Sequence, residues 1–125
     1  MFTEIPALVN EDAALRHRGR FITTTFLADS GTEQHLLSVD RGLLTVVRGP
    51  FVSPRWQFVL RAAPDAWERF WTPIPPPGWH DLMAMIRFQT LIAEGDLHPF
   101  MSNLLWFKDV LASPRRLHST QEVAR

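Results

Sequence analysis

The sequence contains no cysteine and no tyrosine, and its thirteen basic residues include a single lysine, Lys108. Without cysteine the chain can form no disulfide framework, no thiolate metal cluster and no cysteine nucleophile. Thirteen acidic residues balance the thirteen basic ones, and no segment concentrates positive charge. The charge pattern therefore offers no attraction to a nucleic-acid backbone or an anionic membrane, and we expect no nucleic acid as a partner.

Long hydrophobic runs are also missing. Residues 1–20 lack the basic start and apolar core of a signal peptide, and no stretch approaches about 18 uninterrupted apolar residues. We therefore expect a cytoplasmic protein. A chain of 125 residues is long enough for one hydrophobic core, so we expect a single domain over 1–125, with a core of about 10–113 and a mobile tail over 114–125.

Strand-like patterns fill the first half of the chain. Four strands are predicted from alternating apolar and β-branched residues, at 20–28, 33–39, 43–48 and 56–62. A short turn joins the second and third of these as an antiparallel hairpin, and the succession favours a four-stranded meander.

Helical patterns dominate the second half. Helices are predicted near 64–71, 81–89 and 96–111, a brief strand at 90–94, and a further short helix at 10–18. Strands followed by helices are typical of an α+β domain, in which the helices gather on one face of a mainly antiparallel sheet.

The last predicted helix raises a question of its own. Residues 95–111 read GDLHPFMSNLLWFKDVL, and a single helix, with Asp96 accepting hydrogen bonds from its first turn, would gather its apolar side chains in one wide band. Lys108 projects into that band. One interpretation is that its stem covers apolar surface while the ammonium reaches water, and the other is that it anchors a carboxylate or phosphate head group.

Three phrases of the sequence, taken in order, resemble the sterol carrier protein-2 domain family. These are the hairpin LLSVDRGLLTVVRG, the strand-to-helix run WQFVLRAAPDAWERFW and the closing segment AMIRFQTLIAEGDLHPFMSNL. The resemblance implies a five-stranded sheet covered by helices, with an apolar tunnel between them for a sterol, a fatty acyl chain or a related lipid. It implies binding or transfer, with no chemistry.

Large rings and flexible thioethers are concentrated in the helical half. Such side chains repack around varied ligands, although the alternative interpretation of each residue is an ordinary core. The predicted ligand-binding residues are Phe58, Trp67, Phe70, Trp71, Met83, Ile86, Phe100, Met101, Leu104, Phe107 and Lys108.

Catalytic and metal-binding patterns are weak. His80 and Asp81 are adjacent, but Asp81 is better explained as a helix cap. The run from Glu94 to His98 lacks a known metal-ligand spacing, and the serines lack the context of a nucleophile elbow. We therefore expect no catalytic residue, no metal and no cofactor.

Three functions follow from these observations. The leading hypothesis is non-catalytic binding or transfer of a lipid or another hydrophobic small molecule, with transient membrane contact. The first alternative is an accessory module that docks on a larger lipid-handling enzyme, in which the apolar surface contacts a protein partner or forms a homodimer. The second alternative is a small cone-shaped isomerase or hydrolase, with His80 or Asp96 as a buried base.

Overall fold

The computed structural model describes residues 2–117. A 3₁₀ turn at Phe2–Glu4 precedes the helices α1 (Ile5–Asn10), α2 (Ala13–Arg18), α3 (Pro64–Phe70), α4 (Leu82–Arg87), α5 (His98–Ser102) and α6 (Leu104–Ala112). The strands are β1 (Thr23–Asp29), β2 (Gln34–Asp40), β3 (Leu43–Arg48), β4 (Phe58–Arg61) and β5 (Ile92–Gly95).

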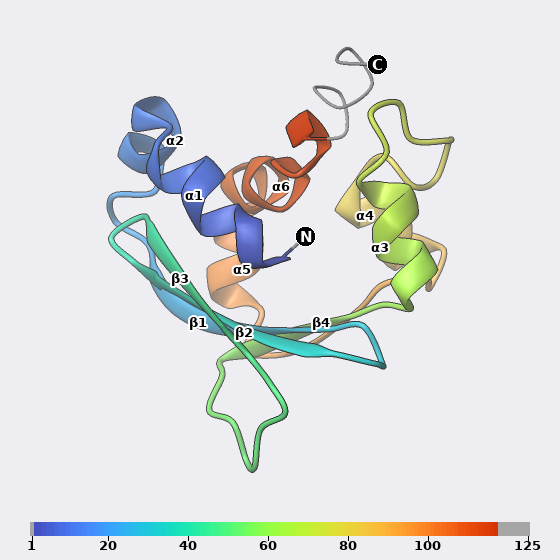
Figure 1. Ribbon diagram of the computed structural model, residues 1–125, viewed down its shortest axis with the longest axis horizontal. Coiled ribbons are helices and arrows are strands. Elements are labelled where there is room, and N and C mark those ends of the chain that lie inside the picture. Colours follow the sequence, from blue (N-terminus) through green and yellow to red (C-terminus); the bar gives the residue numbers. More distant parts are fainter. Residues whose placement is uncertain (1, 118–125) are drawn as a thin grey trace.

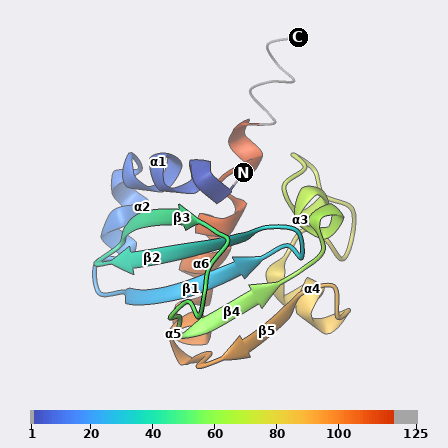
Figure 2. The ribbon, with the colours of Figure 1, turned by 60° about the horizontal axis from the view of Figure 1, so that its bottom comes forward.

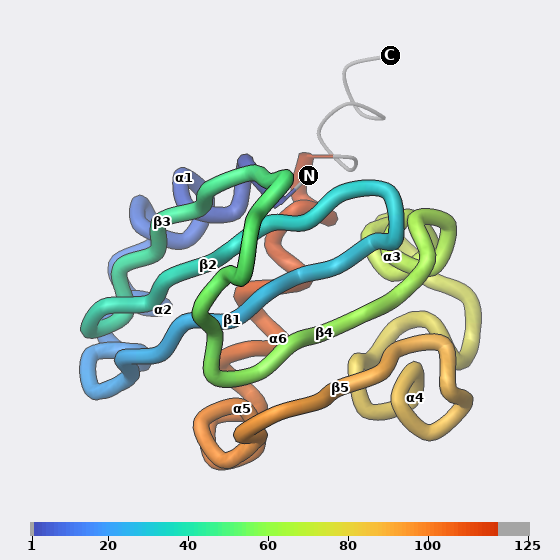
Figure 3. The backbone as a smooth tube through the Cα atoms, turned by 90° about the horizontal axis from the view of Figure 1, so that it is seen from below, coloured from blue at the N-terminus to red at the C-terminus, as the bar shows by residue number. Residues whose placement is uncertain are grey.

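All five strands form one sheet in the order β3-β2-β1-β4-β5 (Figure 2). Three of the four strand pairs are antiparallel, and β1 pairs with β4 in parallel. The predicted four-stranded meander is therefore wrong, because the 49–57 connection crosses the sheet before β4 begins (Figure 3). The parallel register places Phe58 of β4 opposite Phe26 of β1, and the two rings stack with centroids 5.0 Å apart.

The helices lie on one face of the sheet, as predicted (Figure 1). Apolar side chains alternate along the central strands, and the main core forms where this face meets α1, α3 and α6. Phe2, Ile5 and Val9 are buried in this core, so it begins earlier than the predicted boundary at residue 10.

The opposite face carries a smaller covered area. Leu27 and Val59 point away from the main core, yet they are only 2% and 0% exposed. The 49–57 connection crosses this side of the sheet (Figure 3), and a Cβ at Gly95 would lie 2.9 Å from the ring of Trp56.

The last helix differs from its prediction because it is interrupted. Asn103 leaves the helical region (φ −127°, ψ 32°) between α5 and α6, and its side-chain amide donates to the carbonyl of Pro99. Because of this break, the apolar side chains of α5 and α6 do not lie on one common helical face. Met101 and Leu105 are consequently 48% and 72% exposed, whereas α6 buries Trp106, Phe107, Val110 and Leu111.

The end of the chain is anchored as far as the structure describes it. Arg115 donates from its guanidinium to the carbonyls of Phe70 and His80, and it lies over the Phe70 ring. The remainder of the predicted mobile tail, 118–125, lies outside the described residues.

Candidate functional site

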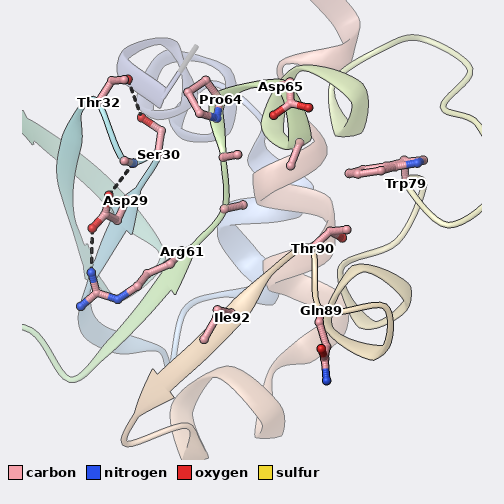
Figure 4. Close-up of a pocket in the computed structure, with 14 residues that line it drawn as sticks. Asp29, Ser30, Thr32, Arg61, Pro64, Asp65, Trp79, Gln89, Thr90 and Ile92 are labelled. Atoms are coloured by element: carbon pink, nitrogen blue, oxygen red, sulfur yellow. Dashed lines mark hydrogen bonds and ion pairs between the residues drawn. The ribbon is translucent and has the colours of Figure 1, made fainter.

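A cavity of about 670 Å³ lies where β1 and β4 end, beside the start of β5 (Figure 4). The turn after β1 stands on one side, and Trp79 stands on the other. Between them runs the connection from β4 into α3. The lining residues are Asp29, Ser30, Gly31, Thr32, Arg61, Ala62, Ala63, Pro64, Asp65, Ala66, Trp79, Gln89, Thr90 and Ile92.

The turn side of the cavity is held by Asp29. One oxygen of its carboxylate accepts from the backbone amide of Gly31 at 2.7 Å, and the other pairs with Arg61 at 2.7 Å. Arg61 is the neighbour of Asp29 in the parallel register of β1 and β4, so the pair locks the ends of two strands together. The Arg61 guanidinium also lies 3.6 Å from the Glu94 carboxylate, so it is shared between two acids.

The opposite side of the cavity comes from the proline-rich connection, residues 72–80, which joins α3 to α4. The guanidinium of Arg69 lies over the Trp79 ring, 4.9 Å from its centroid, which steadies the indole. A second hollow of about 230 Å³ also uses Trp79 and Thr90, and it adds Pro77, Gly78 and Phe88. The end of this connection is therefore a wall of both hollows.

Helix α3 links the cavity to the interior. Pro64 occupies its first turn, where a missing amide hydrogen is tolerated, and the next turn buries Ala66 and Trp67. Ala66 lines the cavity, and the indole nitrogen of Trp67 donates to the carbonyl of Asp29 at 3.4 Å. Ala66 and Trp67 are thus neighbours in α3, the first lining the cavity and the second buried in the core.

None of the eleven predicted ligand-binding residues lines this cavity. Six of them, Phe58, Trp67, Phe70, Trp71, Phe100 and Phe107, are buried in the core. Their rings already touch: Phe58, Phe100 and Phe107 lie with centroids 5.6 Å apart, and Trp67 stacks on Trp71 at 5.6 Å. A ligand among them would have to displace side chains.

The other predicted residues lie nearer the surface. Met83, Ile86 and Leu104 are partly buried, and Met101 is exposed. The structure therefore brings the rings together and leaves the thioethers Met83 and Met101 at the edge of the core.

Lys108 has a partner within the protein. Its ammonium lies 2.9 Å from the carboxylate of Asp81, and both side chains are a little under a third exposed. Burial acts to raise the pKa of Asp81, but the hydrogen bond and charge of Lys108, together with the backbone amides of Met83 and Ala84, hold this pKa below its ordinary value. Asp81 stands at the N-cap position of α4, as predicted, while its carboxylate meets Lys108.

The residues considered for catalysis or metal binding lie at the surface. His80, Glu94, Asp96 and His98 are exposed, and the Asp96 carboxylate accepts from the backbone amide of His98. Within residues 2–117, no three side chains of the metal-binding types are grouped to hold an ion. The described helices are all too short or too polar to cross a bilayer.

Sequence reasoning missed the cavity because its residues looked like connections. Asp29 to Thr32 lie in the gap between two predicted strands, and Ala62 to Pro64 lie where the predicted strand 56–62 meets the predicted helix near 64–71. The signal in the sequence was the pair of small residues Ala62 and Ala63 between a strand and a helix. Small side chains leave space that larger ones would fill.

Comparison with known proteins gives structural matches only. No protein-family model matches the sequence, and no curated protein matches it. The crystal structure of a sterol carrier protein 2 aligns with a TM-score of 0.67 at 13% identity, covering 89% of this chain and 90% of that one. The UbiJ-SCP2 ubiquinone synthesis protein aligns with a TM-score of 0.60 at 14% identity, covering 86% of this chain and 82% of that one.

A larger enzyme contains a similar unit. The inverting sec-alkylsulfatase Pisa1 from a Pseudomonas species aligns with a TM-score of 0.54 at 14% identity, over 70% of this chain and 13% of the enzyme. At such identities the likeness establishes the fold. The chain has the α+β fold of sterol carrier protein 2, which confirms the resemblance inferred from its sequence.

Proposed function

We propose that this protein binds a hydrophobic small molecule without transforming it, and that the 670 Å³ cavity receives the ligand. The observation that carries the proposal is this cavity, set in a fold shared with sterol carrier protein 2. Its volume falls within the range of about 300–1,000 Å³ that is typical of small-molecule sites.

Apolar groups supply the driving force. Ala62, Ala63, Pro64 and Ile92 offer aliphatic surface, and Trp79 adds a broad ring. Burying a ligand against such surface contributes roughly 25 cal/mol per Å² of apolar area removed from water. Ile92 is 51% exposed without a ligand, so covering it is a further gain for the bound state.

In this proposal the buried rings among the residues predicted from the sequence, beginning with Trp67, form an inner wall. A ligand longer than the cavity would pass Ala66 and meet Trp67, whose indole hydrogen bond to Asp29 joins the two regions. Such passage requires α3 and the proline-rich connection to move, because the rings behind them are packed. Sterols and fatty acyl chains belong to this longer class.

Docking is a second candidate function, favoured by a specific observation. Met101 and Leu105 are large apolar residues left exposed where α5 meets α6, and Pisa1 carries a similar unit within a larger enzyme. Exposed apolar surface of this kind is typical of an interface. If the patch pairs two copies of the chain, sedimentation will show a dimer that the substitution Leu105→Gln removes.

A cavity-filling substitution tests the leading proposal. Ala63 is exposed and lines the cavity, so Ala63→Phe should fill part of it without disturbing the core. The matched control is Ala13→Phe, an exposed alanine at the first position of α2 and outside the described cavities. We expect the affinity for 1-decanol, measured by calorimetry, to fall about tenfold in A63F, a loss near 1.4 kcal/mol, and to be unchanged in A13F.

Native mass spectrometry of the purified protein gives an independent test. A retained apolar molecule that is released on denaturation would support the proposal and identify the ligand class. Equal decanol affinity in the native protein and in A63F would refute the assignment of the cavity.

A further inference from the structure

We infer that the cavity selects an uncharged amphiphile, an apolar body bearing a hydroxyl or carbonyl group, over the corresponding carboxylate or phosphate. This inference rests on the proposed function and specifies its ligand class. It follows from the charged groups around the cavity, because the one cation among the described lining residues is already paired with carboxylates.

The one basic side chain among the described lining residues is Arg61. Its guanidinium is 2.7 Å from the Asp29 carboxylate and 3.6 Å from that of Glu94, so two acids already neutralise it. Asp29 is held in turn by the Gly31 amide, and its side chain is only 13% exposed. An anion binding to Arg61 would therefore compete with a carboxylate that has hydrogen bonds on both oxygens.

Asp65 adds a further negative charge to the lining. It lies in the first turn of α3, where its charge suits the helix dipole, and no ion pair is formed by its carboxylate in the described structure. The other nearby cation, Arg69, lies over the ring of Trp79 and does not line the cavity. A carboxylate or phosphate head group would therefore face Asp65 with no free lining cation.

Neutral polar groups line the cavity beside these charges. Ser30, Thr32 and Thr90 carry hydroxyls on the lining, and Gln89 carries a side-chain amide (Figure 4). The Ser30 hydroxyl lies 3.4 Å from that of Thr32 and bonds to the backbone of Glu33 in its own turn. The Thr90 hydroxyl donates to the carbonyl of Met85, which leaves its oxygen as an acceptor for a ligand. Hydroxyl and amide groups can donate to or accept from an uncharged head group without the desolvation that an ion requires.

Lys108, the candidate anchor from the sequence, does not change this conclusion. It lies outside the lining of the 670 Å³ cavity, and its ammonium is paired with Asp81. An acid head group bound at Lys108 would occupy a different part of the molecule.

The test compares 1-decanol with decanoate at pH 7.5, in the native protein and in the substitutions Asp65→Asn and Asp65→Lys. Decanoate is harder to desolvate than decanol in any cavity, so the informative quantity is the change in the ratio of their affinities. Removing and then reversing one nearby charge should raise the relative affinity for decanoate stepwise, by about three- to tenfold in D65K. The matched control is Asp40→Lys, because Asp40 is an exposed carboxylate at the other end of β2.

The outcomes separate this inference from the proposed function. A ratio that rises in D65N and D65K but not in D40K supports the inference. A ratio that stays constant while decanol binds overturns it, as does equal binding of decanoate that is lost in Arg69→Gln. Absence of decanol binding in every variant refutes the proposed function itself.

Discussion

The substitution Lys108→Met separates the two interpretations of the only lysine. In the structure its ammonium pairs with Asp81 at 2.9 Å, with side chains 29% and 28% exposed. Exposed ion pairs contribute about 0–1 kcal/mol, and breaking a buried one costs about 3–5 kcal/mol. At this intermediate exposure we expect the free energy of unfolding to fall by about 1–2 kcal/mol.

The pH dependence of this loss identifies its cause. The pKa of Asp81 is lowered in the folded protein, so the pair stabilises the fold above the ordinary carboxyl pKa of 3.8, and this contribution disappears as the pH falls through the lower folded value. The difference between the native protein and K108M should therefore be full at pH 6 and should shrink below about pH 4.

Thermal unfolding of K108M, Asp81→Asn and the double variant measures the coupling. A loss of 1 kcal/mol corresponds to roughly 4 °C in Tm for a domain of this size. We expect the double variant to lose less stability than the sum of the two single variants. We also expect the ratio of decanoate to decanol affinity to stay unchanged in K108M. Additive losses, or a selective loss of decanoate binding, would refute the ion-pair interpretation and restore the anchor.

The remaining predictions concern the core, one histidine and one glycine. Phe107→Ala should lower the free energy of unfolding by about 3–5 kcal/mol in a urea titration because the ring is fully buried, whereas Leu105→Ala should change it by less than about 0.5 kcal/mol. Burial lowers the pKa of His35 below 6.5, although Glu33 opposes this, so stability should fall as the pH drops below about 6.5; His35→Leu should remove that dependence. Gly95→Ala should lower the Tm more than Gly31→Ala does. Both glycines have positive φ, but of the two only Gly95 would place a Cβ 2.7 Å from a backbone oxygen.

Local patterns in the sequence were sufficient for the layers of the fold. Alternation along β1 places Phe26 and Ala28 on the helical face, and the spacing in α3 places Trp67 and Phe70 on one side. Neither pattern specifies which strand is the neighbour of β4. The parallel pairing with β1 depends on the 49–57 connection crossing the sheet, which local alternation cannot show.

Features that depend on tertiary contacts could not be predicted in the same way. Asn103 interrupts the last helix through its backbone conformation and its bond to Pro99, although its neighbours have helical spacing. The ammonium of Lys108 pairs with the carboxylate of Asp81, which lies far from it in the sequence. The wide apolar band followed from assuming one continuous helix, whereas the partner of Lys108 comes from another element.

The position of the candidate site was the feature that could least be predicted from the sequence. Aromatic residues such as Phe58 and Phe107 suggested adaptable walls, and in the structure they pack against each other. Space is left instead beside small residues such as Ala62 and Ala63, whose composition is that of any connection. Aromatic content identifies surface that can be buried, while the position of a cavity depends on how completely the neighbouring side chains fill the space.

Titration of the ¹⁵N-labelled protein with 1-decanol, followed through backbone amide chemical shifts, tests the central claim most directly. The account predicts saturable shifts at the amides that border the cavity, those of Gly31, Ala63 and Thr90 among them. Shifts confined to the exposed patch around Met101 and Leu105, or no shifts up to the solubility of the alcohol, would contradict it.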